Sequence, residues 1–435
     1  NQVLCNGKCG LFDQNLNNAQ QVIQSETFVD GMAEQSAFWA IGCPKEGQSL
    51  EEVRRLMMEQ VRRLTSGQWD ESLLRAILNN MKRRRLEDMQ SNELRASWFV
   101  DAFVAGKPWA EEVGEMQRLD TLTKKTVVDC ARRMLTDGYA CVYKRQGDDV
   151  TARKIEKPHI SPIVTNRGKS SPFADSVLSM PVAQVEPVFV DFDRDVQKGT
   201  LVGGNELLAH RDASSQLFSL TFVYERGAKE DPALAVAGQY LPYLGTDSLD
   251  ANQLQGRLYG LACDATLSVG DGRTRLTLSG LADNMQEALR LTERWIATAR
   301  PDTDIYAQVV SDILKQRADS KTSQRACYGA LTQYGVYGPH NRVTRALDAA
   351  QMHRLGAAGA LGRLRSLPGV MQHALYYGPL EATQVSRMLN GMHPMSEHPA
   401  PAHSGQFYPP RKVDENLVII APFQAKNTYM MGYSS

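Results

Sequence analysis

The clearest alternation of hydrophobic and polar positions begins at residue 216. Aromatic and aliphatic side chains occupy every second position of residues 218–224, and Ser219, Thr221 and Glu225 are the polar residues on the other side. This period of two predicts a strand with one buried face. Gly227 ends the strand, and Asp231 followed by Pro232 predicts an N-cap and the first position of a helix. That helix is apolar enough to be buried, and Pro242 is expected to end or kink it.

The same patterns predict the other elements. Helical spacing of apolar residues predicts helices over residues 50–64, 70–85, 94–104, 124–135, 248–258, 284–299, 305–317, 324–333 and 345–352. Strands are predicted over residues 36–42, 140–144, 188–195, 265–269, 274–278 and 373–377, with one or two more in residues 411–435. Residues 10–28 predict a strand or loop that leads into a short helix. Ser49 and Ser248 are the expected N-caps of their helices.

Composition restricts the class of protein. The length of 435 residues allows two to four domains. Lys+Arg and Asp+Glu both total 49, so net charge does not indicate a nucleic-acid or acidic-membrane partner. No run approaches the roughly 20 apolar residues that span a bilayer. The sequence does not begin with Met and shows no signal peptide, so we expect a processed product or a piece of a longer chain.

The strand, turn and helix of residues 216–246 resemble the M16 peptidase family, the insulinase or pitrilysin group of inverzincins. In that family the helix carries His-x-x-Glu-His just ahead of a Gly-Thr pair, so that two imidazoles share a zinc ion and the glutamate activates water. Here Gly245-Thr246 is present, but the zinc-ligand and base positions hold Val236, Gln239 and Tyr240. The resemblance therefore implies a degenerate copy of the catalytic domain, with no catalytic or metal residue in this chain.

An ordered series of segments extends the resemblance toward the N-terminus. GLFDQNL, GQSLEEV, AFVAGKPW, LTKKTVVDCA and YACVYKRQG resemble the second domain of M16 peptidases. We therefore predict a second M16-like domain over residues 1–150 without its opening strand, and a proline-rich linker between two halves over 151–186. Residues 187–405 are predicted to form the degenerate third domain, and 406–435 the start of a truncated fourth. The implied fold is α+β, built from repeated sandwiches of mostly antiparallel sheet with helices on one face.

The resemblance implies a function and a set of partners. The chain is expected to be the non-catalytic, substrate-chamber half of a zinc metallopeptidase that hydrolyses peptides, inactive alone and partnered by a catalytic half in the same protein or another chain. Zinc is expected in that missing catalytic domain and no cofactor in this chain. The closest resemblance is to bacterial envelope peptidases, which favours the periplasm or cell envelope. The alternatives are a non-catalytic binding or assembly subunit and a self-contained hydrolase with an unrecognised triad.

Four further stretches carry candidate chemistry. The loop YGVYGPHN is a candidate lining of the substrate chamber through Tyr334, Tyr337, His340 and Asn341. The histidines of residues 393–403 do not fit the inverzincin spacing, because Pro394 occupies the position that needs a ligand, and we predict a structural or linker role.

Cys5 and Cys9 have no second Cys or His pair at zinc-site distance, which favours free thiols or one local disulfide. The basic run 82–85 is interpreted as a solvated helix face.

Overall fold

The structure is a computed structural model that describes residues 1–31, 34–145, 147, 156–162, 165, 167–402 and 408–434. The chain divides into two units. The first contains residues 1–136 together with 196–435, and the second contains residues 137–195. The predicted domain boundaries at residues 150, 186 and 405 describe a larger architecture and stay predictions.

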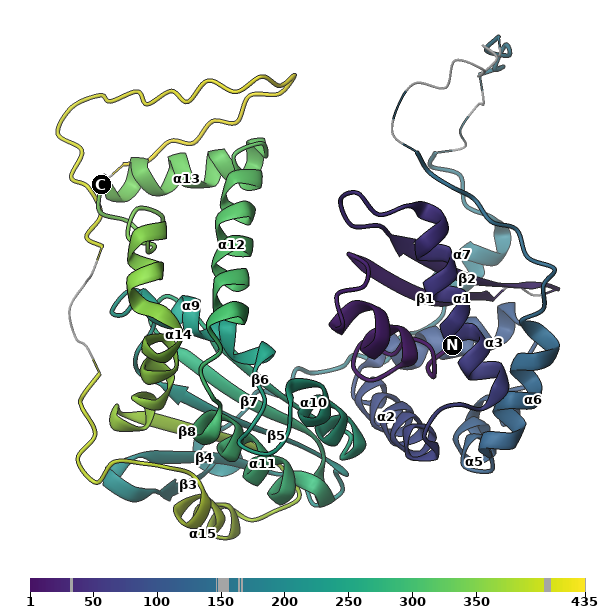
Figure 1. Cartoon of the computed structure of the whole chain (residues 1–435), viewed down its shortest axis with the longest axis horizontal. Coiled ribbons are helices and arrows are strands. Elements are labelled where there is room, and N and C mark those ends of the chain that lie inside the picture. The colour runs from purple at the N-terminus through teal and green to yellow at the C-terminus, as the bar shows by residue number, and fades with distance from the viewer. Residues whose placement is uncertain are drawn as a thin grey trace. The chain divides into compact units, whose positions relative to one another are not determined.

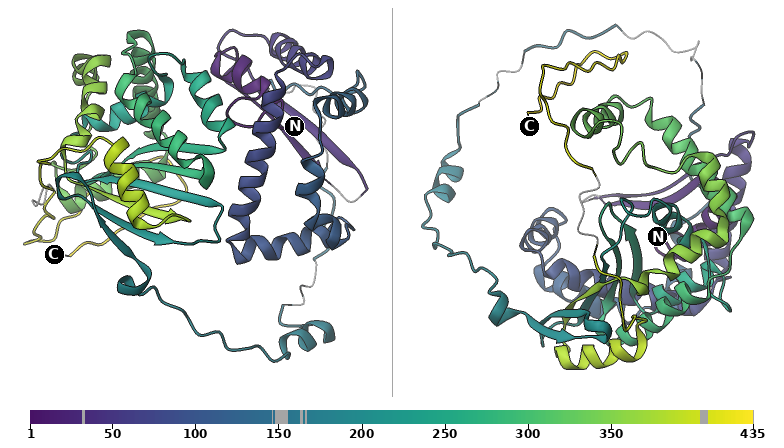
Figure 2. Two further views of the ribbon diagram at one scale, coloured as in Figure 1. Left: turned by 90° about the horizontal axis from the view of Figure 1, so that it is seen from below. Right: turned by 90° about the vertical axis from the view of Figure 1, so that its left-hand side faces the viewer.

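The N-terminal part of the first unit is a two-stranded ribbon with helices. Strands β1 (Gln24–Gly31) and β2 (Ser36–Cys43) are antiparallel and lie side by side (Figures 1 and 2). The helices are α1 (Leu50–Ser66), α2 (Glu71–Met89), α3 (Asn92–Val104), α4 (Trp109–Val113), α5 (Glu115–Leu119) and α6 (Lys124–Met134). The predicted cap of α1 is confirmed, because the Ser49 side chain accepts from the Glu52 amide and Gly67 closes the helix in the left-handed conformation.

The rest of the first unit is a six-stranded sheet with helices. The strands are β3 (Gln197–Thr200), β4 (Glu206–Arg211), β5 (Leu217–Tyr224), β6 (Cys263–Val269), β7 (Thr274–Leu281) and β8 (Gln372–Gly378), in the order β3-β4-β8-β5-β7-β6. Only β4 and β8 are parallel. The helices are α9 (Ala233–Tyr240), α10 (Ala251–Gly260), α11 (Met285–Thr298), α12 (Thr303–Ser320), α13 (Gln324–Tyr337), α14 (Ala349–Arg365) and α15 (Ala382–Met392).

Strand β5 explains how this sheet and its helices form one core. The side chains of Phe218, Leu220, Phe222 and Tyr224 are all at most 3% exposed, and Ser219 and Thr221 between them are half-buried. The same hydrophobic cluster includes residues of α9, α11, α12, α14 and α15. The period of two in the sequence therefore reflects one strand face covered by helices. The predicted fold class, α+β with a mostly antiparallel sheet and helices on one face, is confirmed.

Several predicted elements are wrong. Residues 140–144 form no strand, residues 188–195 form the short helix α8 (Phe192–Asp195) and no strand, and residues 411–434 form no strand. In each case an apolar run is present, but no neighbouring strand pairs with it, and pairing is what makes a strand. In residues 10–28 the predicted order is reversed, because a π-helix (Asp13–Asn18) precedes β1. Helix α10 is capped by Asp250, not Ser248.

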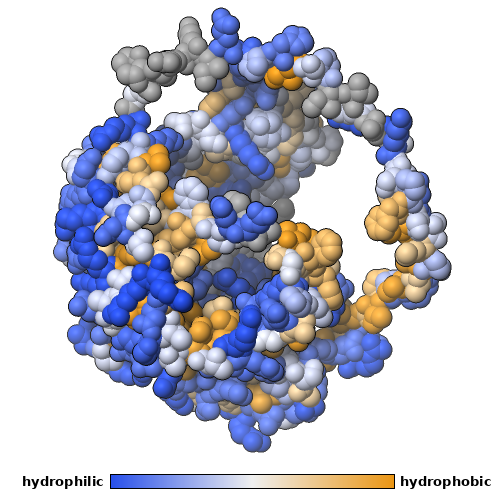
Figure 3. Space-filling model, turned by 90° about the vertical axis from the view of Figure 1, so that its right-hand side faces the viewer, coloured by the Kyte–Doolittle hydropathy of each residue, from blue (hydrophilic) through white to orange (hydrophobic). Residues whose placement is uncertain are grey.

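The second unit is short and carries much exposed apolar surface. Its elements are α8 and α7 (Pro172–Leu178), so a helix begins at the end of the stretch predicted to be extended. Figure 2 shows an extended backbone between α7 and α8, and apolar side chains appear along it in Figure 3. Leu178, Val188 and Phe189 are 80%, 92% and 80% exposed. The unit therefore buries too little apolar surface to form a core of its own.

The interpretation of the basic run as a solvated face is wrong for two of its residues. The Arg83 side chain is 16% exposed and forms an ion pair with Asp264 at the start of β6. Arg83 Nη1 lies 2.7 Å from Asp264 Oδ2, but the angle between the groups does not meet the criteria for a hydrogen bond. One turn earlier on α2, the Asn80 amide donates to the carbonyl oxygen of Tyr259 on α10 at 2.7 Å. Arg85 stacks on Trp98 and pairs with Glu112. These arginines therefore tie α2 to its neighbours.

The turn after α9 generates a prediction about stability. A Cβ added to Gly245 would lie 1.9 Å from the Leu249 carbonyl oxygen, in a turn where Thr246 exchanges hydrogen bonds with Leu249. We expect Gly245→Ala to lower the free energy of unfolding by about 1–3 kcal/mol, because the backbone must shift. In the matched control Gly256→Ala, inside α10, the added Cβ meets nothing within 4 Å. This control should be stabilising by about 0.5–1 kcal/mol. Urea denaturation checks both, and equal effects would contradict the account.

Candidate functional site

Helix α9 places the three degenerate zinc-motif positions on two different surfaces. Val236 and Tyr240 are 3% and 0% exposed and belong to the apolar core, and Gln239 is exposed. The Gln239 side chain donates to the Ala235 carbonyl of its own helix at 3.3 Å. Gly238 lies so close to β6 that an added Cβ would be 2.9 Å from Val269. The predicted helix is confirmed, and it begins one residue after Pro232.

Tyr240 connects α9 to the start of α12. Its hydroxyl donates to the Asp302 carbonyl oxygen at 2.8 Å and accepts from the Asp302 amide at 2.7 Å. Asp302 is the N-cap of α12, and its side chain accepts from the amides of Asp304 and Ile305. The Tyr240 ring meets Tyr306 edge-on with 5.2 Å between centroids. Burial raises the pKa of Tyr240, so the phenol stays protonated. Tyr240 thus packs in the core and connects α9 to α12 through hydrogen bonds.

Metal-binding side chains do not gather near α9. Within the described ranges of the chain, no group of three or more His, Cys, Asp or Glu residues is arranged to hold a metal ion. Cys5 and Cys9 are free thiols, and burial raises the pKa of each to about 11, which disfavours the thiolate that zinc needs. In the part that the structure describes, no helix is long and apolar enough to cross a membrane.

The four candidate chamber residues lie at the end of α13 and in the loop after it. Asn341 is 1% exposed, and its amide group bonds within the loop, donating to Gly338 and accepting from the amides of Val343 and Thr344. His340 is exposed. Asn341 therefore shapes the loop, and only the other three side chains have atoms available for other contacts. Whether they line a substrate chamber stays a prediction.

The C-terminal segment 408–434 runs beside α13 (Figure 1). Tyr337 contacts Tyr408 with 6.5 Å between ring centroids, and the Arg411 guanidinium lies 5.6 Å from the Tyr334 ring centre. The Arg411 amide donates to the Val336 carbonyl oxygen at 2.7 Å. Further along, Tyr328 donates to the Met430 carbonyl oxygen at 3.2 Å. The aromatic side of α13 is thus contacted by the chain's own C-terminal segment.

His393 is a core histidine held on both sides. It is 4% exposed, with Nδ1 2.7 Å from Glu293 Oε1 on α11 and Nε2 2.8 Å from Gln372 Oε1 on β8. Its ring stacks on Phe222 of β5 with 3.6 Å between centroids. The backbone N–H of Gln372 in turn donates to Asn205 Oδ1. A structural role was predicted for this histidine cluster, but no local pattern indicated the partners of His393, which lie 100 and 21 residues away along the chain.

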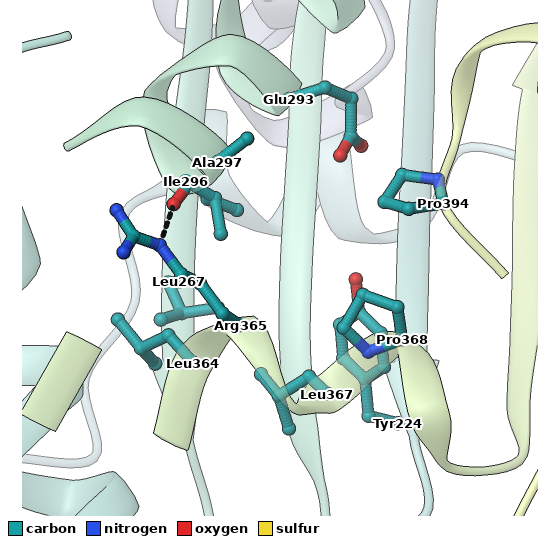
Figure 4. Close-up of a pocket in the computed structure, with 10 residues that line it drawn as sticks. All are labelled: Tyr224, Leu267, Glu293, Ile296, Ala297, Leu364, Arg365, Leu367, Pro368 and Pro394. Carbon is teal, nitrogen blue, oxygen red and sulfur yellow. Dashed lines mark hydrogen bonds between the residues drawn. The ribbon is translucent and has the colours of Figure 1, made fainter. Parts of the chain in front are cut away.

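A cavity of about 260 Å³ opens beside this network (Figure 4). It is lined by residues of β5, β6, α11, the end of α14, the 3-10 turn Leu367–Gly369 and the turn that follows α15, among them Tyr224, Leu267, Glu293, Arg365, Leu367 and Pro394. The Tyr224 hydroxyl and the Glu293 carboxylate both point into it. No local pattern predicted the cavity, because its walls come from six separate elements and each residue looks ordinary within its own element.

No protein-family model matches the sequence, and no curated protein matches it significantly. Solved structures do match. A peptidase M16 inactive domain from Pseudomonas fluorescens is 17% identical with a TM-score of 0.44, covering 50% of this chain and 55% of that one. The periplasmic protease PqqL from Escherichia coli is 15% identical with a TM-score of 0.42, covering 94% of this chain and 48% of that one.

A third similar structure is the ferredoxin protease FusC in complex with Arabidopsis ferredoxin, which is 11% identical with a TM-score of 0.44 and covers 89% of this chain and 46% of that one. The chain spans about half the length of each of these three structures. At these identities and scores the likeness concerns the fold and no residue's role. The first of these structures carries the name of the family that the sequence resembles, as a non-catalytic domain of it.

The Tyr240 anchor yields a prediction. We expect Tyr240→Phe to lower the free energy of unfolding by about 1–2 kcal/mol, because the Asp302 amide and carbonyl lose their buried partner. Tyr243, three residues along and 53% exposed, supplies the matched control Tyr243→Phe, which should change stability little. Thermal and urea denaturation of both variants measure the difference. An unchanged Tyr240→Phe variant would show that α9 does not depend on this bond.

A further prediction about stability compares His393 with His398. His393→Phe keeps a ring on Phe222 but leaves Glu293 and Gln372 without their partner, so we expect a loss of about 2–3 kcal/mol. His398 is exposed and lies in the same proline-rich stretch. His398→Phe should therefore stay within about 0.5 kcal/mol of the unaltered protein. Denaturation curves compare the pair, and equal losses would mean that the Glu293–His393–Gln372 network is not stabilising.

Proposed function

We propose that this chain is the non-catalytic, substrate-chamber half of an M16-type zinc metallopeptidase that hydrolyses peptides. The single observation that carries the proposal is helix α9. It follows β5 and a turn, as the zinc-binding helix does in the family that the sequence resembles, and it ends just before Gly245-Thr246. Its motif positions hold Val236, Gln239 and Tyr240, none of which supplies an imidazole or a carboxylate.

The packing around α9 supports a structural use of the helix. Val236 and Tyr240 are buried in the core, and the Tyr240 hydroxyl bonds to the N-cap residue of α12. A helix with this role stabilises the fold and leaves zinc and water activation to the catalytic half. On this proposal the substrate is a peptide or protein, the partner is a catalytic half that holds the zinc, and the location is the bacterial periplasm or cell envelope.

The proposal is tested by the metal content and activity of the purified chain, expressed without a histidine tag. We expect much less than one zinc per chain by plasma mass spectrometry, because the motif positions offer no ligand. We also expect no hydrolysis of a fluorogenic peptide library. Stoichiometric zinc that resists dialysis, or hydrolysis by this chain alone, would contradict the proposal.

A second arm separates the peptidase half from a binding or assembly subunit. The sequence encoded ahead of residue 1, or a separately purified partner, should contain His-x-x-Glu-His. Adding this chain to that catalytic half should raise its rate of peptide hydrolysis, because the substrate chamber becomes complete. Binding to partners with no change in any hydrolysis rate would favour the assembly subunit.

A further inference from the structure

We propose that the cavity between β5, α11 and the end of α14 binds an alkylammonium group, a primary ammonium on an aliphatic chain, with Glu293 as its counter-ion. The proposal concerns a site on the helix side of the sheet and does not depend on the proposed function. The group could belong to a free alkylamine or to a lysine side chain of a peptide, since both present the same chemistry.

Glu293 supplies the charge. Its side chain is 14% exposed, and its Oε1 lies 2.7 Å from His393 Nδ1. Among the residues that the structure describes, no other hydrogen bond or ion pair reaches this carboxylate. A carboxylate accepts about four hydrogen bonds when ionised, so the side of Glu293 that faces the cavity can accept from a further donor. The carboxylate points into the cavity, where a cationic donor would complete its coordination (Figure 4).

Tyr224 supplies a second acceptor at the same place. The residue is 3% exposed, and within the described ranges its hydroxyl has no hydrogen-bond partner. Figure 4 shows this hydroxyl directed into the cavity toward the side of Glu293. A hydroxyl at the surface of a mostly apolar cavity can accept a hydrogen bond from a cationic donor bound there. Burial, and then the charge of Glu293, raises the pKa of Tyr224 well above its ordinary value, so the phenol is neutral and offers lone pairs to an ammonium.

The remaining walls suit an aliphatic chain. Leu267, Leu367 and Pro368 line the cavity with carbon atoms. Arg365 also lines it, but its guanidinium donates to the carbonyl oxygens of Ile296 and Ala299 at the end of α11. In Figure 4 its terminal nitrogens point away from Glu293 and Tyr224. The arginine therefore contributes its stem and leaves the acidic side chain as the charge that faces the ligand. An apolar wall with one acidic end matches a ligand with an aliphatic stem and a cationic head.

The test compares two probes on the unaltered protein, n-pentylamine and n-pentanol, by saturation-transfer NMR and calorimetric titration. The probes share an aliphatic chain and differ in charge. We expect pentylamine to bind at least about tenfold more tightly, because only it offers a charged donor to Glu293. Equal affinities, or binding of pentanol alone, would overturn the proposal. Failure here would leave the zinc and hydrolysis tests of the proposed function untouched.

Two variants locate the site. Glu293→Gln keeps the side-chain shape and should weaken pentylamine binding about tenfold, and Tyr224→Phe should weaken it several-fold. Glu287→Gln is the control, because Glu287 lies on the same helix with its side chain 53% exposed and pairs with Arg290. Its binding should equal that of the unaltered protein. If Glu293→Gln fails to fold, Tyr224→Phe still decides, since unchanged binding by that variant would place the amine elsewhere.

A second pair of probes identifies the source of the ammonium. Acetyl-lysine-amide and its form acetylated on the side-chain nitrogen differ only in the terminal charge. Binding of the first and not the second would assign the cavity to lysine side chains. Binding of pentylamine alone would assign it to free amines, because the peptide backbone would then be excluded by the walls.

Discussion

The structure of the sheet domain depends on burying one face of β5. Phe218, Leu220 and Phe222 are at most 2% exposed, and they are covered by helices that arrive from widely separated parts of the sequence. Because β5 lies between β8 and β7, both of its edges are hydrogen-bonded to neighbouring strands. This pairing fixes its position in the sheet. Helix α9 follows directly and is held by the Tyr240 hydroxyl on Asp302. The predicted motif positions lie on the helix that follows this buried strand, and the cavity beside Tyr224 lies at the end of the same strand.

The predicted motif positions on α9 hold residues whose side chains pack and form hydrogen bonds and offer no zinc ligand. The ligands of a zinc site must converge on one ion, but Val236 and Tyr240 face the core and Gln239 faces outward. Val236 and the Tyr240 ring add buried apolar surface to the core, and the Tyr240 hydroxyl forms hydrogen bonds with two backbone groups. The same residues therefore stabilise α9 against α12. This is the physical basis for assigning the chain a scaffold role in the proposed peptidase.

Several polar residues are buried near β5 and form a hydrogen-bonded network. Glu293, His393 and Gln372 come from α11, the segment after α15, and β8, and they meet beside the stacked ring of Phe222. His393 was recognisable in the sequence only as one of several histidines among prolines. Its burial depends on a helix a hundred residues earlier, so no local pattern reveals its partners. Tyr224 was predicted to be buried, but its unpaired hydroxyl emerges only when α11 and α14 are placed above it.

The sequence by itself determined the elements that rest on local physics. Alternation predicted β5, Ser49 predicted the start of α1, and the apolar runs of residues 265–269 and 274–278 predicted β6 and β7, because each signal is carried by neighbouring residues. It also predicted the helix that became α9. Only the tertiary structure decided that β8 lies between β4 and β5, that residues 188–191 and 411–434 find no strand partner, and that a cavity lies beside Glu293. These features depend on pairings between distant segments, which a one-dimensional pattern does not specify.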